Sequence, residues 1–365
     1  MSNPCGSAPS DHFSVSEVTL ATIRELFRSD SGSLSESPIF YQPSYLQFIE
    51  EAFGLEPRHT MIFAVANRRP LALLPAFEVS MNLKGFSRVL PCASIRSVQS
   101  LPFFTPGGLL PIGVVPEPEH CGHYLAGAVN HLTTTYDIDF VRVLEVVFSP
   151  KTSCSATLPS PFRTHRWGYW FRIGKAHDVQ EIWQKRMSKK ARNAVRFAEK
   201  TGVNMQTTNL RDSLSLFYDL YRDHYSHLNK KTATRGLDIY EKLSECFGDD
   251  VFVMVSYVDR EPVGANLFTI TGRCLTILNN VSLSRALRYK VNNYLYWKTI
   301  VFGWEMGART FDFGGGPLLD VTHANFKESM GGKPYPILQC DCRVKSLLSV
   351  GFGLALRSLA SVWDR

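Results

Sequence analysis

The 365-residue sequence lacks a marked excess of any one kind of residue, and this excludes several classes of protein. Hydrophobic residues make up 44% and charged residues 20%, so the chain is not disordered, collagen-like or built on a disulfide framework. The net charge of +7 is too small for a nucleic-acid packaging protein, although it allows a polyanionic ligand. Residues 1–15 contain no basic segment followed by an apolar core, so we expect no secretory signal and a cytoplasmic protein.

Long apolar runs and paired cysteines are also missing. The stretch 344–363 is apolar but interrupted by Ser and Gly, so it predicts a packing helix rather than a membrane span. Peripheral contact of this helix with a lipid surface stays open as a weaker alternative. The eight cysteines are scattered, and only Cys340 and Cys342 lie close together, with no His or Cys pair beside them. This spacing predicts reduced thiols and no metal site.

Length and composition predict the domain organisation. A chain of 365 residues favours two domains of roughly 150 to 200 residues each. At 149–161, Ser, Thr and Pro replace the periodic apolar residues, which indicates a linker. We therefore expect a first domain over 1–150, a linker over 151–165, a second domain over 166–343 and a C-terminal helix over 344–365.

Both halves show the same order of predicted elements. The second half has strands at 167–173, 251–258, 263–270 and 274–281, a helix at 291–306, and strands at 310–313 and 336–342. The first half has strands at 60–66 and 71–79, a helix at 119–133 and a strand at 138–146. Each half is thus an antiparallel meander and a helix, after which a strand rejoins the sheet parallel to its neighbour. This order predicts an α/β fold with mixed, mostly antiparallel sheets flanked by helices, splayed where the late strand enters.

Four short motifs follow one another in the second half. They are the basic helix end 198–203 (AEKTGV), the turn 260–265 (REPVGA), the strand 311–314 (FDFG), and Phe326-Lys327 followed by Gly331-Gly332. In this order and spacing, the region 183–336 resembles the FemAB/BioF2-like branch of the GNAT acyltransferase superfamily. The resemblance implies two tandem GNAT-like domains, the first degenerate, that form an amide or ester by acyl transfer. It also implies an aminoacyl-tRNA or an acyl-CoA as donor, and no tightly bound cofactor.

Three residues are candidates for the chemistry. Acyl transfer passes through a tetrahedral oxyanion, which needs a fixed positive group or backbone N–H donors. Lys327 is our first candidate, because the resemblance implies that a lysine after Phe326 stabilises the transition state; the alternative is a solvated helix lysine. Asp312 either orients a substrate amine or caps a turn. His323 lies near enough in sequence to act as a general base, although a lone histidine on a helix is usually a surface residue.

A basic run at 185–200 is a candidate anion site. It contains seven positive residues and only one acidic residue, Glu199. Helical spacing places Lys189, Arg192 and Arg196 on one face, where like charges repel one another without a counter-anion. The ligand would be CoA phosphates, a tRNA backbone or a nucleotide-linked acceptor. The alternative is a solvated helix face.

The segment 284–290 (SRALRYK) contains no glycine. In GNAT enzymes that use acetyl-CoA, a glycine-containing turn here lets the backbone approach the pyrophosphate at a helix N-terminus. Its absence favours aminoacyl-tRNA or another donor, although Arg285, Arg288 and Lys290 can still bind phosphate through their side chains.

The acceptor implied by this reaction is a small-molecule or nucleotide-linked amine. Phe103 and Phe104, in a turn-rich loop, and Phe326 are candidates for lining an acceptor cleft between the domains. A structural turn explains the loop equally well. The alternative from another functional class is a non-catalytic GNAT-like module whose basic helix binds nucleic acid or another anionic partner.

Overall fold

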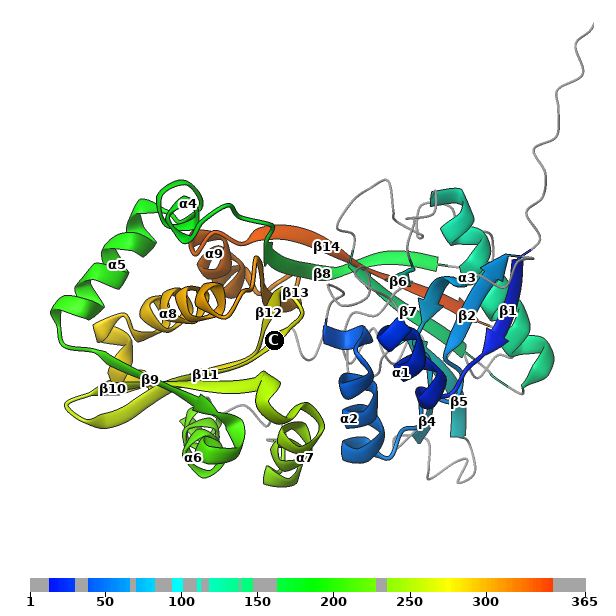
Figure 1. Cartoon of the computed structure of the whole chain (residues 1–365), viewed down its shortest axis with the longest axis horizontal. Helices are drawn as coiled ribbons and strands as arrows, with labels where there is room; N and C mark the ends of the chain where they lie inside the picture. The colour runs from blue at the N-terminus through cyan, green and yellow to red at the C-terminus, as the bar shows by residue number, and fades with distance from the viewer. Residues whose placement is uncertain are drawn as a thin grey trace, which may run out of the picture.

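The computed structural model describes residues 13–29, 39–65, 70–82, 94–100, 110–112, 118–136, 138, 140–146, 163–227 and 235–343. The predicted cleft residues Phe103 and Phe104 and the predicted helix 344–365 lie outside these residues, as does most of the predicted linker. Figure 1 shows two lobes side by side, with the first half of the chain in one lobe and most of the second half in the other.

The first lobe contains short strands and three helices among its described residues. In chain order they are β1 (Phe13–Glu17), α1 (Leu20–Ser29), the 3-10 turn η1 (Ile39–Tyr41), α2 (Pro43–Phe53), β2 (Met61–Val65), β3 (Pro70–Leu74), β4 (Phe77–Asn82), β5 (Ser94–Ser100), β6 (Leu110–Pro111), α3 (Pro118–Thr135) and β7 (Phe140–Val146). The predicted strand 71–79 is wrong as one element. It is two strands, β3 and β4, which belong to different sheets because the chain leaves β3 just before Pro75.

The second lobe contains the longer elements. They are β8 (Arg163–Ile173), α4 (Val179–Glu181), the π-helical turn η4 (Ile182–Arg186), α5 (Lys189–Lys200), β9 (Asn204–Asn209), α6 (Leu210–His227), α7 (Leu237–Phe247), the 3-10 turn η5 (Gly248–Asp250), β10 (Val251–Val258), β11 (Glu261–Thr271), β12 (Cys274–Ser282), the 3-10 turn η6 (Ser284–Tyr289), α8 (Val291–Glu305), β13 (Thr310–Pro317), α9 (Val321–Ser329) and β14 (Lys333–Arg343). The predicted meander, the helix after it and the late strand are confirmed. Strand β8 begins at Arg163, inside the segment predicted as linker.

One sheet runs through both lobes. Its ten strands have the order β4-β5-β7-β14-β8-β13-β12-β11-β10-β9, while β1, β2, β3 and β6 form a separate four-stranded sheet. The long strands β8 and β14 cross from one lobe to the other (Figure 1). Strand β14 pairs with β7 of the first lobe from Ile337 onward and with β8 from Lys333 onward. Strand β14 therefore joins the sheet of the first half and the sheet of the second half, which the sequence predicted separately.

The ten-stranded sheet is splayed as predicted. Strand β13 runs parallel to β12 over three residue pairs, from Cys274 and Thr310 to Thr276 and Asp312. Beyond them β12 continues beside β11 to Ser282, while β13 continues beside β8 to Pro317. The two strands separate because each keeps a different neighbour.

Two apolar cores cover the faces of this sheet in the second lobe. On one face α6 and α7 pack together with α1, α2 and η1 of the first lobe, so this core is shared between the lobes. On the other face α5, α8 and α9 pack over the splayed strands. No helix in the described part of the chain is both long and apolar enough to cross a membrane.

Candidate active site

Two bulges face each other where β12 and β13 separate. On β12, the register with β11 shifts so that Leu278 has no residue opposite it. On β13, the register with β8 shifts between Asp312 and Gly315, and Gly314 adopts a left-handed φ of 75°. A left-handed backbone favours glycine, and bulges of this kind are common beside active sites.

The Lys327 side chain extends from α9 to these bulges. Its Nζ donates hydrogen bonds to the carbonyl oxygens of Gly314 at 3.3 Å and Gly315 at 3.2 Å, and lies 5.5 Å from the ring centre of Phe171. A Cβ atom on Gly314 would lie 3.9 Å from this Nζ and 3.6 Å from the carbonyl oxygen of Ile277 on β12. The ammonium group therefore lies at the splay between the two strands.

Lys327 is not a solvated surface residue, because only 8% of it is exposed. Burial lowers the pKa of its ammonium to about 8, although the Asp320 carboxylate acts in the opposite direction. The carbonyls of Gly314 and Gly315 take two of the three N–H donors, which leaves one donor for a ligand. A buried cation with a donor to spare is suited to stabilise a developing negative charge.

His323 lies one turn before Lys327 on α9. Asp320 caps this helix by accepting a hydrogen bond from the backbone N–H of His323 at 3.3 Å, and its other carboxylate oxygen lies 2.5 Å from His323 Nδ1. Nδ1 is the donor in this contact, because a carboxylate only accepts. The histidine side chain is 69% exposed. In the neutral imidazole, Nε2 is therefore the ring nitrogen that carries the lone pair.

The structure does not bring Asp312 to Lys327. Asp312 is fully buried and forms a two-pronged ion pair with Arg172, whose Nη2 lies 2.7 Å from Oδ2. Neighbouring strand residues point to opposite faces, and Phe313 packs against Tyr296 of α8, so Asp312 faces away from α8. Burial opposes the charge on Arg172, but the Asp312 carboxylate outweighs it and raises the pKa of the guanidinium. The ion pair joins β13 to β8 beside the bulge, which is a structural role different from the turn cap considered above.

The three predicted anion-binding residues of the basic run differ in their surroundings. Arg192 donates to the backbone carbonyls of Trp183, Gln184 and Met187, so its guanidinium stabilises the end of η4. The guanidinium of Arg196 lies 5.4 Å from the ring centre of Trp183, and Lys189 is exposed. Arg192 keeps its predicted position on the same helix face as Lys189 and Arg196, but its guanidinium turns toward the neighbouring carbonyls.

The segment between β12 and α8 is the 3-10 turn η6. In it, Arg285 pairs with Glu261 at 3.3 Å and Arg288 lies over the ring of Tyr289, while Lys290 takes a left-handed φ of 60° at the start of α8. Because β12 and β13 are parallel, η6 and the first turn of α9 lie at the same end of the splay. The predicted acceptor residue Phe326 packs edge-on against Tyr296, 5.0 Å between ring centres.

A cleft of about 480 Å³ lies where β8 ends and β14 begins. Its charged lining comprises Arg172, Lys175, Arg186, Glu328 and Lys333. Glu328 follows Lys327 directly on α9, so the cleft opens beside the end of the helix that carries the lysine. Sequence reasoning missed Lys175 and Lys333, because neither belongs to a motif and the strands alone bring them together.

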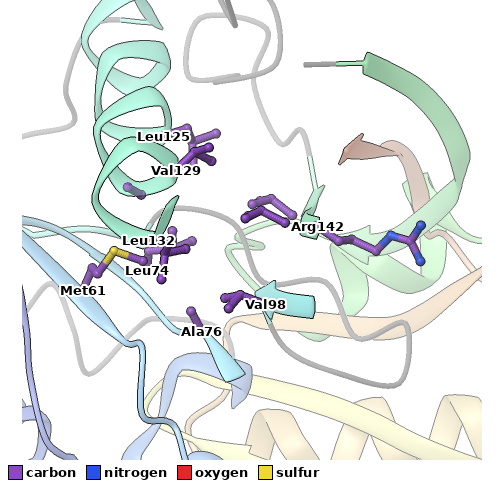
Figure 2. Close-up of a pocket in the computed structure, with 11 residues that line it drawn as sticks. Met61, Leu74, Ala76, Val98, Leu125, Val129, Leu132 and Arg142 are labelled. Atoms are coloured by element: carbon purple, nitrogen blue, oxygen red, sulfur yellow. The ribbon is translucent and has the colours of Figure 1, made fainter. Parts of the chain in front are cut away.

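A smaller hollow in the first lobe lies between α3 and the neighbouring strands (Figure 2). Its volume is about 10 Å³, which is room for one water molecule. Arg142 is the only charged residue of its lining, and its guanidinium points away from the apolar side chains to Asp341, 2.9 Å from Nε to Oδ1 (Figure 2). This hollow is a packing defect of the core.

Across the residues with described positions, no three His, Cys, Asp or Glu side chains gather in a way that could hold a metal ion. Cys340 and Cys342 are buried in the core of the first lobe and form no disulfide with each other.

Comparison with known proteins identifies relatives of this fold. Residues 184–328 match the family model of the acetyltransferase (GNAT) domain. Among solved structures, the chain is similar to FemX, with 12% sequence identity and a TM-score of 0.63 over 90% of this chain and 96% of that one. It is also similar to a tandem GNAT protein from the clavulanic acid biosynthesis pathway, with 9% identity and a TM-score of 0.50 over 92% of this chain and 99% of that one.

A third similar structure is a conserved protein of unknown function from Bacteroides thetaiotaomicron, with 11% identity and a TM-score of 0.53 over 91% of this chain and all of that one. No protein with a curated function matches the sequence. At these identities the likeness shows a shared fold. The predicted class, an α/β fold with mixed sheets flanked by helices, is confirmed.

Proposed function

Because residues 184–328 form a GNAT domain within a FemAB-like fold, we propose that this acyltransferase moves an aminoacyl group from an aminoacyl-tRNA to an amine and forms an amide. The observation that carries the proposal is the Lys327 ammonium, buried at the splay and held there by the carbonyls of Gly314 and Gly315. The acceptor is a small-molecule or nucleotide-linked amine.

The reaction makes one C–N bond and breaks one C–O bond. The acceptor ammonium first loses a proton, and its nitrogen then attacks the ester carbonyl carbon of the donor. The carbonyl oxygen becomes an oxyanion, which receives a hydrogen bond from the remaining N–H of Lys327. Collapse of this intermediate releases the ribose oxygen, which leaves with a proton, while the nitrogen loses its second proton.

His323 is the base in this proposal. Asp320 holds Nδ1 of His323, so Nε2 is free to accept the proton of the acceptor ammonium. Lys327 and His323 are four residues apart on α9, and a helical side chain leans toward the N-terminus of its helix. The ammonium of Lys327 thus lies beneath the turn that carries His323, and one substrate can meet both groups.

The local structure after β12 supports tRNA rather than CoA as donor. The turn η6 contains no glycine, so side chains at every position shield its backbone from a pyrophosphate. The similarity to FemX, at a TM-score of 0.63, supports the fold of the FemAB branch, for which an aminoacyl-tRNA is one of the two donors that the resemblance implies. The tandem GNAT protein was described with reference to AcCoA, so an acyl-CoA is the donor to test against it.

Incubation with radiolabelled aminoacyl-tRNAs or labelled acetyl-CoA, and with a panel of amines, tests the proposal. We expect labelled amide from charged tRNA, and a turnover roughly 100-fold lower in Lys327→Met because the oxyanion loses its cationic donor. The matched control is Lys242→Met, an exposed lysine on α7, which should turn over like the wild type.

Three results would contradict parts of the proposal. Label transfer from acetyl-CoA alone would show that the donor is wrong. Binding of tRNA without consumption of either donor would indicate a non-catalytic module. Equal turnover of Lys327→Met and Lys242→Met would remove Lys327 from the mechanism.

A further inference from the structure

The outer surface of α5 carries positive charge that the proposed chemistry does not use. Lys189, Arg196 and Lys200 occupy positions i, i+7 and i+11 and thus form one stripe along the helix. All three are exposed, as are Lys185 before the helix and Lys190 beside the stripe. These five residues are here called the α5 basic face.

We propose that the α5 basic face binds the phosphates of RNA, and that it docks the acceptor arm of the tRNA donor. This inference rests on the proposed function, because it supplies the binding surface for the donor named there. It assigns to α5 a role in binding and none in catalysis.

Within the described residues, no acidic side chain forms an ion pair with the α5 basic face. Glu199 is the only acidic residue between 182 and 200, and it pairs with Lys298 of α8 at 3.6 Å. Arg196 and Lys200 are four residues apart, a spacing at which like charges repel. Bound phosphates would remove this repulsion and release counterions, which is the main source of affinity for nucleic acids.

The opposite side of α5 explains why a membrane is not the partner. Ala191, Val195 and Ala198 are buried in the core with α8, so the apolar side of the helix is already covered. An interfacial helix needs that apolar side free to enter a lipid layer. Only polar groups and one aromatic ring, Phe197 at 46% exposure, face outward from α5. A basic surface with one exposed ring suits a phosphate backbone with a base stacked on the ring.

The position of α5 connects this surface to the active site. The backbone N–H of Ser188, at the start of α5, donates to the carbonyl of Ser329 at the end of α9, 2.9 Å away and two residues after Lys327. The cleft with Lys175, Arg186 and Lys333 opens beside this contact, because its lining includes Arg186, two residues before Ser188, and Glu328, the residue before Ser329. Helix α5 itself spans about 18 Å. Figure 1 shows α5 at the outer edge of the second lobe, with α8 beside it on the inner side.

A triple variant, Lys189→Gln, Lys190→Gln and Lys200→Gln, tests the proposal. The KM for a full aminoacyl-tRNA should rise about tenfold or more relative to the KM for an aminoacylated CCA trinucleotide, which is too short to reach α5. The slope of log affinity for uncharged tRNA against log salt should become shallower by about one for each lysine that contacts a phosphate. The control triple, Arg58→Gln, Arg211→Gln and Arg273→Gln, removes the same charge from exposed sites elsewhere and should leave both quantities unchanged.

Each outcome is informative. If the KM for both donors changes equally, or if tRNA affinity matches that of the control triple, the α5 basic face is not the docking site. Loss of binding to vesicles with 30% phosphatidylserine, without loss of tRNA binding, would also overturn the proposal. If neither donor is consumed by the wild type but the triple variant still loses tRNA affinity, the docking site stands and the proposed function fails.

Discussion

The buried ammonium of Lys327 has carbonyl oxygens around it, and no carboxylate among the described residues is in hydrogen-bonding contact with it. A buried charge of this kind lowers the stability of the folded state. Burial disfavours the charged form of Lys327 and lowers its pKa to about 8. In the unfolded chain the lysine keeps its ordinary pKa of 10.5. Between pH 8 and 10.5 the unfolded state therefore binds more protons than the folded one.

This difference predicts how stability depends on pH. The unfolding free energy of the wild type should rise between pH 8 and 10.5 by no more than about 3 kcal/mol, because deprotonation removes the cost of the buried charge. Lys327→Met lacks this charge, so it should be at least as stable as the wild type at pH 7, and its advantage should shrink as the pH rises. Urea unfolding at pH 7, 9 and 10 measures the difference. A Met variant that is less stable at pH 7 would show that the ammonium stabilises the fold.

The role of His323 predicts a dependence on the acceptor. His323→Gln should lower turnover about 100-fold with an ordinary primary amine, which must lose a proton before attack. With hydroxylamine, an amine that is already neutral at pH 7, the loss should be much smaller. Steady-state rates with the two acceptors measure this, and Lys327→Met serves as control because it should lose activity with both. Equal losses in His323→Gln would mean that the histidine only caps α9.

Residue by residue, the sequence was informative where a motif was local. The motif Phe326-Lys327 before two glycines indicated Lys327 as a candidate. The structure buries this lysine at the splay. The ion pair of Asp312 could not be predicted, because its partner Arg172 lies 140 residues away and nothing in the sequence pairs them. The hydrogen bonds of Arg192 could not be predicted either. Its guanidinium donates to carbonyls of a π-helical turn, which helical spacing does not predict.

At the scale of elements, alternation and turn residues predicted the meander β10–β12, helix α8 and the parallel strand β13. They underestimated β14, which was expected to begin at Pro336 but begins at Lys333. Proline is usually excluded from a central strand because it lacks an N–H donor. Pro334 and Pro336 are tolerated because β14 has only β8 beside it there, and β7 joins from Ile337 onward.

The bulges at Leu278 and Gly314 could not be predicted from the pattern. A bulge is defined by the register of two strands, and the sequence of one strand does not contain the register of its neighbour. The splay itself was predictable from the order of elements. The two bulges that shape it, and the contact between Gly314 and Lys327, required coordinates.

For the whole molecule, the shared sheet and the shared core predict cooperative unfolding. Phe40 of the first lobe packs edge-on against Trp170 of β8, 5.4 Å between ring centres, and α2 packs on α7 in the same core. Calorimetry should therefore show one unfolding transition for both lobes. Asp341→Asn, which weakens the link from β14 to Arg142 of β7, should melt at a lower temperature but still in one step. Two separate transitions in the wild type would mean that the lobes are independent.

This joined sheet was not foreseeable, because β14 pairs with strands that precede it by up to about 200 residues, and separate domains are the ordinary expectation for a chain of this length.

Strand β14 has one more consequence. It starts six residues after Lys327 and ends paired with β7, so a single stiff segment of backbone leads from the site of bond formation into the opposite lobe. Residues of the first lobe that pair with β14 are thereby linked through one continuous strand to the turn after α9, the helix that carries Lys327.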